Sequence, residues 1–374
     1  MRDRRSMSNA SESCEAAVAG DWRWQLQHAI RDLDELAKQL GVGVAALADC
    51  VSAARRFPVL VPPYYLSCAR TLDRTDPIVR QCLPAAAELA QVSGEDPDPF
   101  DEARLSPVPG LVHRYPDRVL FLATNRCAVH CRHCLRKRLW AAPVFSVDAS
   151  MLAGVLGYLG AHPEVREVII SGGDPLLLET ATLDGILAAL AAVPSIARVR
   201  IASRLPVVLP QRFDRELCRA LGRHLPVWLV THFNHPYELT ETAAAAVLAL
   251  LKAGVPVLNQ TVLLRGINDD AAVLAALFTG LLDIRVKPYY LFHGDPVSGA
   301  MHFRTGIDRG LAIMGELRGR ISGLAMPTFA IDLPGGAGKV PVENRYQCGE
   351  NGAGQRVFRS YGGHEIVYGE GGVD

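Results

Sequence analysis

The chain has 374 residues, of which 49% are hydrophobic and 21% charged, and its 39 acidic and 39 basic side chains balance. A balanced charge provides no general attraction to nucleic acid or to an anionic membrane, so neither is expected as a partner. No apolar run reaches the ~18 residues of a membrane span, and the polar, basic N-terminus lacks the hydrophobic stretch of a secretory signal, which predicts a cytoplasmic protein.

The first part of the chain is predicted to be helical. Apolar side chains recur at helical spacing over residues 22–40, and residues 44–54 and 78–92 are also helix-like. A polar, proline-containing connector, "SGEDPDPFD", follows them and marks a boundary. The predicted segments are a disordered N-terminus (1–20), a helical region (21–100), a barrel (101–320) and a C-terminal segment with a tail (321–374).

After the connector, short apolar runs alternate with amphipathic helical runs, which is typical of βα units with a parallel sheet. The predicted strands are 119–124, 167–171, 199–203, 227–231, 255–264 and 286–292, and the helices between them are 149–159, 183–192, 213–221, 240–253 and 271–282. Six units predict an α/β fold, an open or partial (β/α)6 barrel of the TIM type. Its functional groups are expected at the C-terminal ends of the strands.

Three of the nine cysteines are clustered, as Cys127-x3-Cys131-x2-Cys134 directly after the first predicted βα strand. Three thiolates on one loop can bind three irons of a [4Fe-4S] cube and leave the fourth iron open to an exogenous chelating ligand. A structural zinc site needs four protein ligands, so His130 or His133 would have to complete it. The other six cysteines lack paired spacing, as expected of reduced thiols.

Two further motifs lie near strand ends. The glycines of "ISGGDPLLL" (170–178) would let backbone amides approach a bound carboxylate or amine, although Gly-Gly-Asp turns are also common in structural loops. The segment "HRYPDR" places Arg114 and Arg118 four residues apart. Two planar guanidinium groups at that spacing suit a phosphate dianion, and a solvated basic turn is the alternative.

The glycine-rich segment "DLPGGAGK" ends in Lys339 but lacks the spacing and the Ser/Thr of a nucleotide P-loop. Lys339 on such a loop would form a Schiff base with pyridoxal phosphate (PLP), whose phosphate the two arginines would bind; a mobile surface loop is the alternative. Asp295 and Asp332 lie at or beyond the last predicted strand. They would form an anionic pocket for a cationic substrate group, or serve as turn or helix-cap residues.

In combination, these segments resemble the radical S-adenosylmethionine (SAM) superfamily and, within it, the lysine 2,3-aminomutase family. The resemblance covers about residues 22–361 and preserves the order of the family motifs. These are "PGLVHRYPDRVLFL", "CAVHCRHCLRKR", "SGGDPLLL", "RLPVVLPQR", "THFNHPYELT", "LNQTVLLRGIND", "VKPYYLF", "HFRT" and "DLPGGAGK".

The resemblance implies a role for each candidate residue. The [4Fe-4S] cluster would be bound by Cys127, Cys131 and Cys134, with the amino and carboxylate groups of SAM on the open iron. The SAM site would comprise His133, Ser171, Gly172, Gly173, Asp174, Ser203, Arg204, His232 and Gln260. Lys339 would carry PLP, and Arg114, Tyr115 and Arg118 would hold its phosphate. Arg136 would pair with the substrate carboxylate, and Asp295 and Asp332 with its distal ammonium.

The implied activity is an isomerase reaction that exchanges an amino group and a hydrogen between C2 and C3 of an amino acid. L-lysine is the expected substrate, and arginine is the alternative, because Gly294 stands where the family usually has a cysteine. The expected partners are a reductant such as flavodoxin or ferredoxin and further copies of the chain in a homo-oligomer. The competing interpretations are an iron-sulfur electron carrier and a zinc-stabilised binding module.

Overall fold

The computed structural model of the chain describes residues 21–343, 346–353 and 355–368. The prediction of disorder for 1–20 therefore lies outside the described residues. Within the described part, no helix is both long enough and apolar enough to cross a bilayer.

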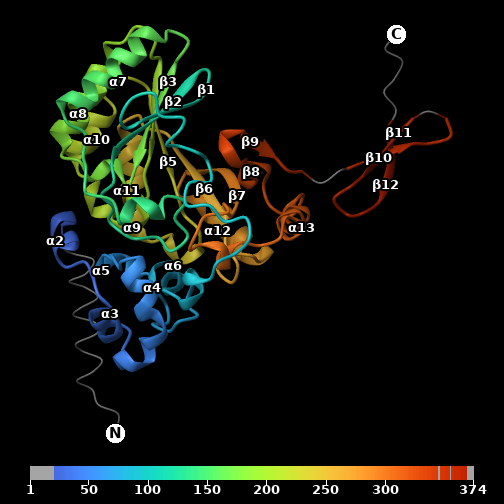
Figure 1. Cartoon of the computed structure of the whole chain (residues 1–374). Helices are drawn as coiled ribbons and strands as arrows, with labels where there is room; N and C mark the ends of the chain where they lie inside the picture. Colours follow the sequence, from blue (N-terminus) through green and yellow to red (C-terminus); the bar gives the residue numbers. More distant parts are fainter. Residues whose placement is uncertain (1–20, 344–345, 354, 369–374) are drawn as a thin grey trace.

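In the part of the chain that the structure describes, the main sheet contains nine strands, each hydrogen-bonded to its neighbour in sequence order. The six predicted strands are confirmed, with ends that differ by two residues or fewer: β2 (Arg118–Thr124), β3 (Glu167–Gly172), β4 (Arg198–Ala202), β5 (Val227–Thr231), β6 (Val257–Leu263) and β7 (Lys287–His293). They are parallel and form the curved centre of the nine-stranded barrel (Figure 1). The predicted partial (β/α)6 barrel is therefore confirmed.

Three strands extend this barrel beyond the six that the sequence predicts. β1 (Leu111–Tyr115) pairs antiparallel with β2, β8 (Thr328–Leu333) pairs parallel with β7, and β9 (Gly338–Pro341) pairs antiparallel with β8. The segment "HRYPDR", interpreted as a basic stretch before the first strand, is in fact the hairpin between β1 and β2. β8 and β9 fall in the segment 321–374 that was expected to extend beyond the barrel, and they continue its sheet.

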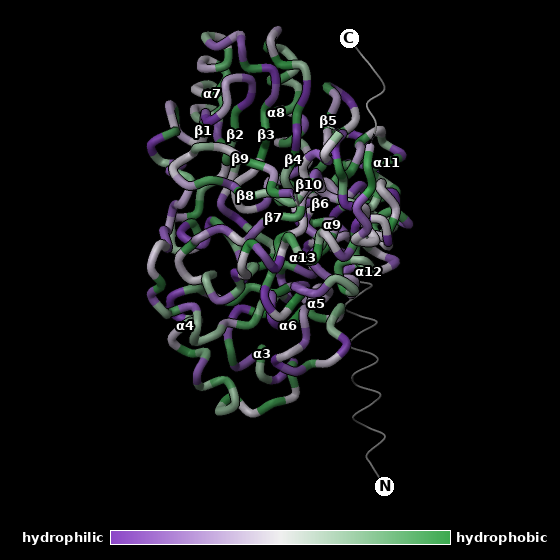
Figure 2. The backbone as a smooth tube through the Cα atoms, turned by 90° about the vertical axis from the view of Figure 1, so that its right-hand side faces the viewer, coloured by the Kyte–Doolittle hydropathy of each residue, from purple (hydrophilic) through white to green (hydrophobic). Residues whose placement is uncertain are grey.

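Helices cover the outside of the sheet (Figure 1). They are α7 (Ala149–Ala161), α8 (Thr180–Ala191), α9 (Leu205–Val208), α10 (Arg215–Leu221), α11 (Glu241–Lys252), α12 (Ala271–Asp283) and α13 (Ile307–Leu317). Side chains cap several N-termini, among them Asp148 on α7, Thr240 on α11 and Asp270 on α12. Figure 2 shows hydrophobic residues running along the barrel strands and into the helices that pack on them.

The N-terminal region consists of short helices rather than the three longer ones predicted. They are α2 (Trp22–Gln27), α3 (Leu33–Gln39), α4 (Val51–Arg56), α5 (Pro63–Ser67) and α6 (Pro77–Cys82), with the 3-10 helices η1 (Val44–Cys50) and η2 (Ala86–Leu89). The predicted helix over 22–40 is interrupted because Ile30 forms a β-bridge with Val61 and Asp32 starts a new helix as N-cap. In 78–92, Pro84 follows the end of α6 and separates it from η2.

The N-terminal region covers the end of the barrel at which the parallel strands finish. Backbone hydrogen bonds from His130 N to Leu60 O and from Arg132 N to Gln81 O, both 2.9 Å, join it to the loop after β2. That loop contains the three clustered cysteines. The region therefore braces the cysteine loop directly.

A buried ionic cluster strengthens this junction. Glu88 on η2 accepts hydrogen bonds from Arg132 Nε at 2.9 Å and from Lys137 Nζ at 2.7 Å. None of the three side chains is more than 1% exposed. One carboxylate thus pairs with two buried cations next to the cysteine loop.

The Glu88→Gln variant is expected to lower the free energy of unfolding by about 3–5 kcal/mol, because Arg132 and Lys137 would remain buried without an anion. Urea unfolding measures this change. Glu179→Gln is the matched control, since it removes the exposed ion pair with Arg23 and should cost less than about 1 kcal/mol. Equal effects of the two substitutions would contradict the importance of the buried cluster.

A separate antiparallel sheet follows the barrel. It contains β10 (Gln347–Glu350), β11 (Arg356–Arg359) and β12 (Glu365–Tyr368) and projects away from the barrel in Figure 1. Its side chains at Ile366, Val367 and Tyr368 are exposed.

Candidate active site

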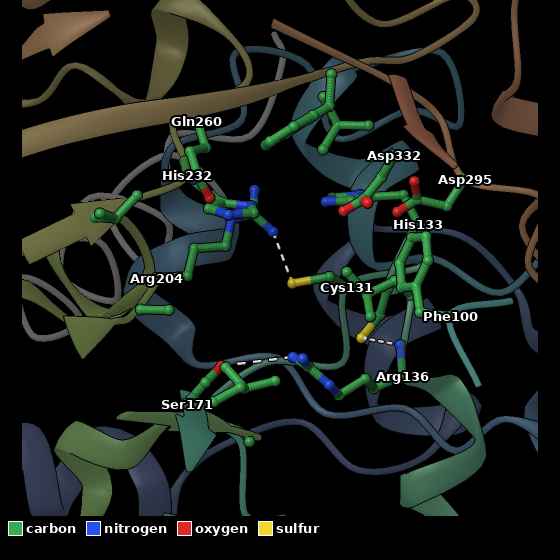
Figure 3. Close-up of a pocket in the computed structure, with 18 of the residues that line it drawn as sticks. Phe100, Cys131, His133, Arg136, Ser171, Arg204, His232, Gln260, Asp295 and Asp332 are labelled. Carbon is green, nitrogen blue, oxygen red and sulfur yellow. Dashed lines mark hydrogen bonds between the residues drawn. The ribbon is translucent and has the colours of Figure 1, made fainter. Parts of the chain in front are cut away.

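A cavity of about 490 Å³ opens at the C-terminal ends of the barrel strands. All the predicted site residues line it: Arg114, Tyr115, Arg118, Cys127, Cys131, His133, Cys134, Arg136, Ser171, Gly172, Gly173, Asp174, Ser203, Arg204, His232, Gln260, Asp295, Asp332 and Lys339. Figure 3 shows part of this lining and labels ten of its residues, from the cysteine loop to Asp332 on β8. The structure therefore brings together motifs that lie more than 200 residues apart in the sequence.

The three cysteines form a donor set that suits an iron-sulfur cluster. Burial raises the pKa of Cys134 to about 11 and that of Cys127 well above its usual value, and the neighbouring cysteines add to both shifts. Thiolates this close together need a metal centre to compensate their charge. In the described residues, no group of three or more His, Cys, Asp or Glu side chains converges on a single metal-ion position. A zinc site needs such convergence, whereas a cube binds each thiolate through a different iron.

Neither histidine of the loop completes a zinc site with the cysteines. His130 Nδ1 lies 2.9 Å from the carbonyl oxygen of Pro58, and its ring stacks on Trp140 at 4.4 Å, outside the cavity lining. His133 does line the cavity, and its buried Nδ1 has no hydrogen-bond partner among the described residues. A buried nitrogen without a partner beside the cysteines indicates that a ligand in the cavity would form the missing hydrogen bond.

The glycines after β3 have a different role from the one predicted. A Cβ atom at Gly172 would lie 2.0 Å from Thr124 O, and one at Gly173 would lie 2.2 Å from Arg126 O. The amides of Gly173 and Asp174 donate to these two carbonyls at 2.7 Å, so they are not free to approach a ligand. The glycines instead allow the loop after β3 to pack directly against the cysteine loop.

Asp174 fixes the loops after β3 and β4 to each other. Its carboxylate accepts hydrogen bonds from Ser203 Oγ at 2.8 Å and from Arg204 N at 2.8 Å, and burial raises its pKa to about 6. Two strands further along the sheet, His232 and Gln260 line the same wall of the cavity (Figure 3). Burial lowers the pKa of His232 to about 4, which keeps this side chain neutral.

Arg136 is held in place by an acid that sequence reasoning missed. Glu102 accepts from Arg136 Nη2 at 2.7 Å and from Arg138 Nη2 at 2.7 Å. Although burial opposes its ionisation, these two cations lower the pKa of Glu102 to about 2. The other end of the guanidinium, Arg136 Nη1, lies 3.4 Å from Ser171 Oγ at the cavity wall (Figure 3). Glu102 therefore fixes the orientation of Arg136 at the cavity wall.

The opposite wall gathers an amine, two guanidinium groups and an aromatic ring. Lys339 Nζ lies 2.7 Å from Asp332 Oδ2, and Arg114 also pairs with Asp332. Tyr115 OH accepts a hydrogen bond from Lys339 N at 2.9 Å, and the guanidinium of Arg118 lies 3.8 Å from the centre of the Tyr115 ring. An amine beside two arginines and a tyrosine fits an aldehyde cofactor that carries a phosphate.

Asp295 adds a second carboxyl group to this wall. Burial raises its pKa to about 7, and the charge of Asp332 contributes to the shift. Two neighbouring carboxyl groups in an enclosed site favour a cationic ligand, because a cation relieves both their desolvation and their mutual repulsion.

Several residues of the site have no local sequence signal. Glu102 directly follows the connector, and Glu238 lies inside the motif "THFNHPYELT" without being distinguished from its neighbours. Tyr289, Tyr290 and Phe292 on β7 also line the cavity, and they lie inside the motif "VKPYYLF" without being distinguished from its other residues. Their role depends on contacts between segments far apart in the sequence.

Comparison with known proteins gives two family matches and several similar enzymes. Residues 121–278 match the family model described as the radical SAM superfamily, and residues 314–372 match the one described as lysine-2,3-aminomutase. The chain is 44% identical to a putative L-lysine 2,3-aminomutase of Aquifex aeolicus, with 93% of this chain and 95% of that protein covered. It is 43% identical to the L-lysine 2,3-aminomutase of Clostridium subterminale, with 94% and 84% covered. It is 39% identical to the glutamate 2,3-aminomutase of Clostridioides difficile, with 87% and 78% covered.

Proposed function

Because this chain belongs to the lysine 2,3-aminomutase family of radical SAM enzymes, we propose that it interconverts L-lysine and β-lysine by exchanging an amino group and a hydrogen between C2 and C3. It is an isomerase that uses a [4Fe-4S] cluster, SAM and PLP. When bound, the reduced cluster and SAM supply a carbon-centred radical, and PLP supplies the carbonyl carbon that holds the migrating nitrogen.

The residues of the chain hold and orient these groups. Cys127, Cys131 and Cys134 would bind the cluster, and the walls formed by His133, residues 171–174, Ser203, Arg204, His232 and Gln260 would surround SAM. Lys339 would hold PLP, with its phosphate on Arg114, Tyr115 and Arg118. Arg136, fixed by Glu102, would bind the substrate carboxylate. The contribution of the protein is mainly orientation and exclusion of water from a reactive radical.

The placement of Asp295 and Asp332 beside Lys339 supports a basic substrate most directly. An amino acid held at Lys339 and Arg136 would extend its side chain toward these two carboxyl groups. An acidic side chain would meet like charges there, whereas the ammonium of lysine would neutralise them.

Packing around Gly294 favours lysine over arginine. A Cβ atom at Gly294 would lie 3.3 Å from Cγ of Arg304, and Arg304 Nε donates to Gly294 O at 2.7 Å. The space left by the missing side chain therefore borders Arg304, which limits the room for a larger guanidinium head.

An anaerobic assay with lysine, arginine and glutamate tests the proposal. The reconstituted protein with SAM, PLP and a strong reductant is expected to convert lysine to its β-isomer at least about tenfold faster than arginine, by kcat/KM, and not to convert glutamate. Preferential conversion of glutamate would overturn the argument from the two aspartates. Preferential conversion of arginine would overturn the argument from Gly294.

The use of lysine is expected to depend on the ionisation of Asp295. Its pKa of about 7 means that protonation below that pH removes the charge that attracts the substrate ammonium. Binding of the ammonium favours the ionised form and releases this proton, so kcat/KM should lose about a factor of ten per pH unit below about 7 from this group alone.

The pH profile of kcat/KM in Asp295→Asn checks this dependence. In a plot of log kcat/KM against pH, the slope below about pH 7 should be smaller by one in the variant than in the parent, because Asp295 no longer titrates. Any remaining slope comes from other groups. The same slope in both proteins would assign the dependence to another group.

Further parts of the proposal concern the surroundings of the enzyme. A one-electron donor such as flavodoxin or ferredoxin would reduce the cluster, and the enzyme would act in the cytoplasm. The exposed apolar side chains of β12 would suit contacts between copies in a homo-oligomer.

A further inference from the structure

One of the three clustered cysteines accepts a charged hydrogen bond from outside its own loop. Arg204, in the loop after β4, donates from Nη1 to Cys131 Sγ at 2.8 Å, as the dashed line in Figure 3 shows. The Arg204 side chain is only 9% exposed. A cationic donor is thus buried against a sulfur that would bind iron.

The remaining bonds of Arg204 fix its direction. Nη2, which carries two protons, lies within hydrogen-bond distance of three acceptors: Glu238 Oε1 at 2.8 Å, Gln81 Oε1 at 2.6 Å and Tyr65 OH at 2.9 Å. Nε donates to the carbonyl oxygen of His232 at 3.2 Å. These bonds engage Nη2 and Nε, so Nη1 is the nitrogen that faces the Cys131 sulfur. The guanidinium cannot turn away without breaking several buried hydrogen bonds.

The acceptors are themselves anchored. Glu238 Oε2 accepts from the backbone N–H of Asn234 at 2.5 Å and of His235 at 3.1 Å. Gln81 and Tyr65 belong to the helices α6 and α5 of the N-terminal region, and both also donate to Glu238 Oε1. The N-terminal region therefore helps to hold Arg204 against Cys131.

We propose that Arg204 is a positioning residue that raises the reduction potential of the cluster through the positive charge that its hydrogen bond places at Cys131 Sγ, and that Glu238, Gln81 and Tyr65 hold it in that position. This inference rests on the proposed cluster at the three cysteines. Reduction adds one electron whose charge is shared with the sulfur ligands, so a cationic donor at a sulfur stabilises the reduced form more than the oxidised form. The negative charge of Glu238 lies on the far side of the guanidinium and offsets this effect only in part.

Arg204→Met is expected to make reduction harder. At a fixed solution potential near the midpoint, the ratio of reduced to oxidised cluster should fall by about tenfold, which for one electron corresponds to a shift of about 59 mV to more negative potential. The measurement is an EPR-monitored redox titration of the reconstituted protein without SAM, PLP or amino acid. Iron content per chain is determined on the same samples.

Arg212→Met is the matched control. Arg212 is 1% exposed and donates to the carbonyl oxygens of Leu176 and Leu178 at 2.9 and 3.1 Å, but it does not line the cavity. Its loss disturbs a buried arginine to a similar degree and should leave the potential unchanged. An equal shift in both variants, or no shift in Arg204→Met with full iron content, would overturn the inference.

A second pair of variants makes the same test if Arg204→Met fails to bind iron. Arg204→Lys and Arg204→Gln both keep an N–H donor, but only lysine keeps the charge. The Gln variant is expected to be shifted to more negative potential and the Lys variant to stay close to the parent, and equal potentials would overturn the inference. Failure of the parent protein to bind a cluster would instead refute the proposed function.

Discussion

Replacing Lys339 with alanine is expected to abolish the visible absorbance of bound PLP and to lower the mutase rate by at least about a thousandfold. Among the described residues, Lys339 presents the only lysine amine in the cavity lining, with its Nζ 2.7 Å from Asp332 and its backbone N–H bound to Tyr115 OH. Without that amine, PLP would be held only by its phosphate contacts and its carbonyl carbon would not be fixed. Absorbance spectra of the anaerobically reconstituted protein and single-turnover rates measure the two effects.

Lys339→Arg is the matched control for charge. Arginine can keep the ion pair with Asp332 but cannot form the carbon-nitrogen bond with PLP, so this variant should also lack the absorbance band. Survival of the band in either variant would assign PLP to another lysine. The cluster signal should be unchanged in both, because Lys339 lies on β9 and the cysteines follow β2.

Removing either carboxylate of the pocket for the substrate ammonium is expected to lower kcat/KM for lysine by about 30- to 5,000-fold. This corresponds to a loss of about 2–5 kcal/mol in transition-state stabilisation, because the substrate ammonium would be buried without one of its partners. Asp295→Asn should lower kcat/KM for lysine without changing PLP retention. Asp332→Asn should in addition weaken PLP retention, since Asp332 pairs with both Lys339 and Arg114.

Kinetics with lysine and PLP absorbance separate these two effects. Asp308→Asn, on the exposed surface of α13, is the control and should change neither. Unaltered kcat/KM for lysine in Asp295→Asn would refute the assignment of this residue to the substrate. Equal PLP retention in the two aspartate variants would refute the additional role of Asp332.

The sequence was sufficient for the six parallel strands because their apolar runs are separated by amphipathic helices of regular length. It was not sufficient for β1, β8 and β9. β1 is short and polar and turns at Pro116, and β9 follows a glycine-rich segment, so neither has a strand-like pattern. β8 follows α13 and pairs parallel with β7, so it is a further unit of the same kind, beyond the point at which the predicted pattern stopped.

The same distinction applies to the site. Cys127, Lys339 and Asp332 could be selected because they lie in motifs with a recognisable order. Glu102 and Glu238 could not, because their significance arises only when Arg136 and Arg204 from other segments are brought against them. The correction at Gly172 and Gly173 has a similar origin, since the neighbouring Thr124 and Arg126 carbonyls are visible only in three dimensions.

In the described residues, β1 and β9 end the nine-stranded sheet without pairing to each other. Side chains bridge this seam instead: Arg114 binds Gly336 O and Asp332, and Tyr115 OH binds Lys339 N. The wall of the barrel can therefore part along one line without breaking a ladder of backbone bonds. The residues that connect the two edges are those proposed to bind PLP. Bound PLP would therefore link β1 to β9, and its loss would weaken the barrel first at this seam beside the cavity.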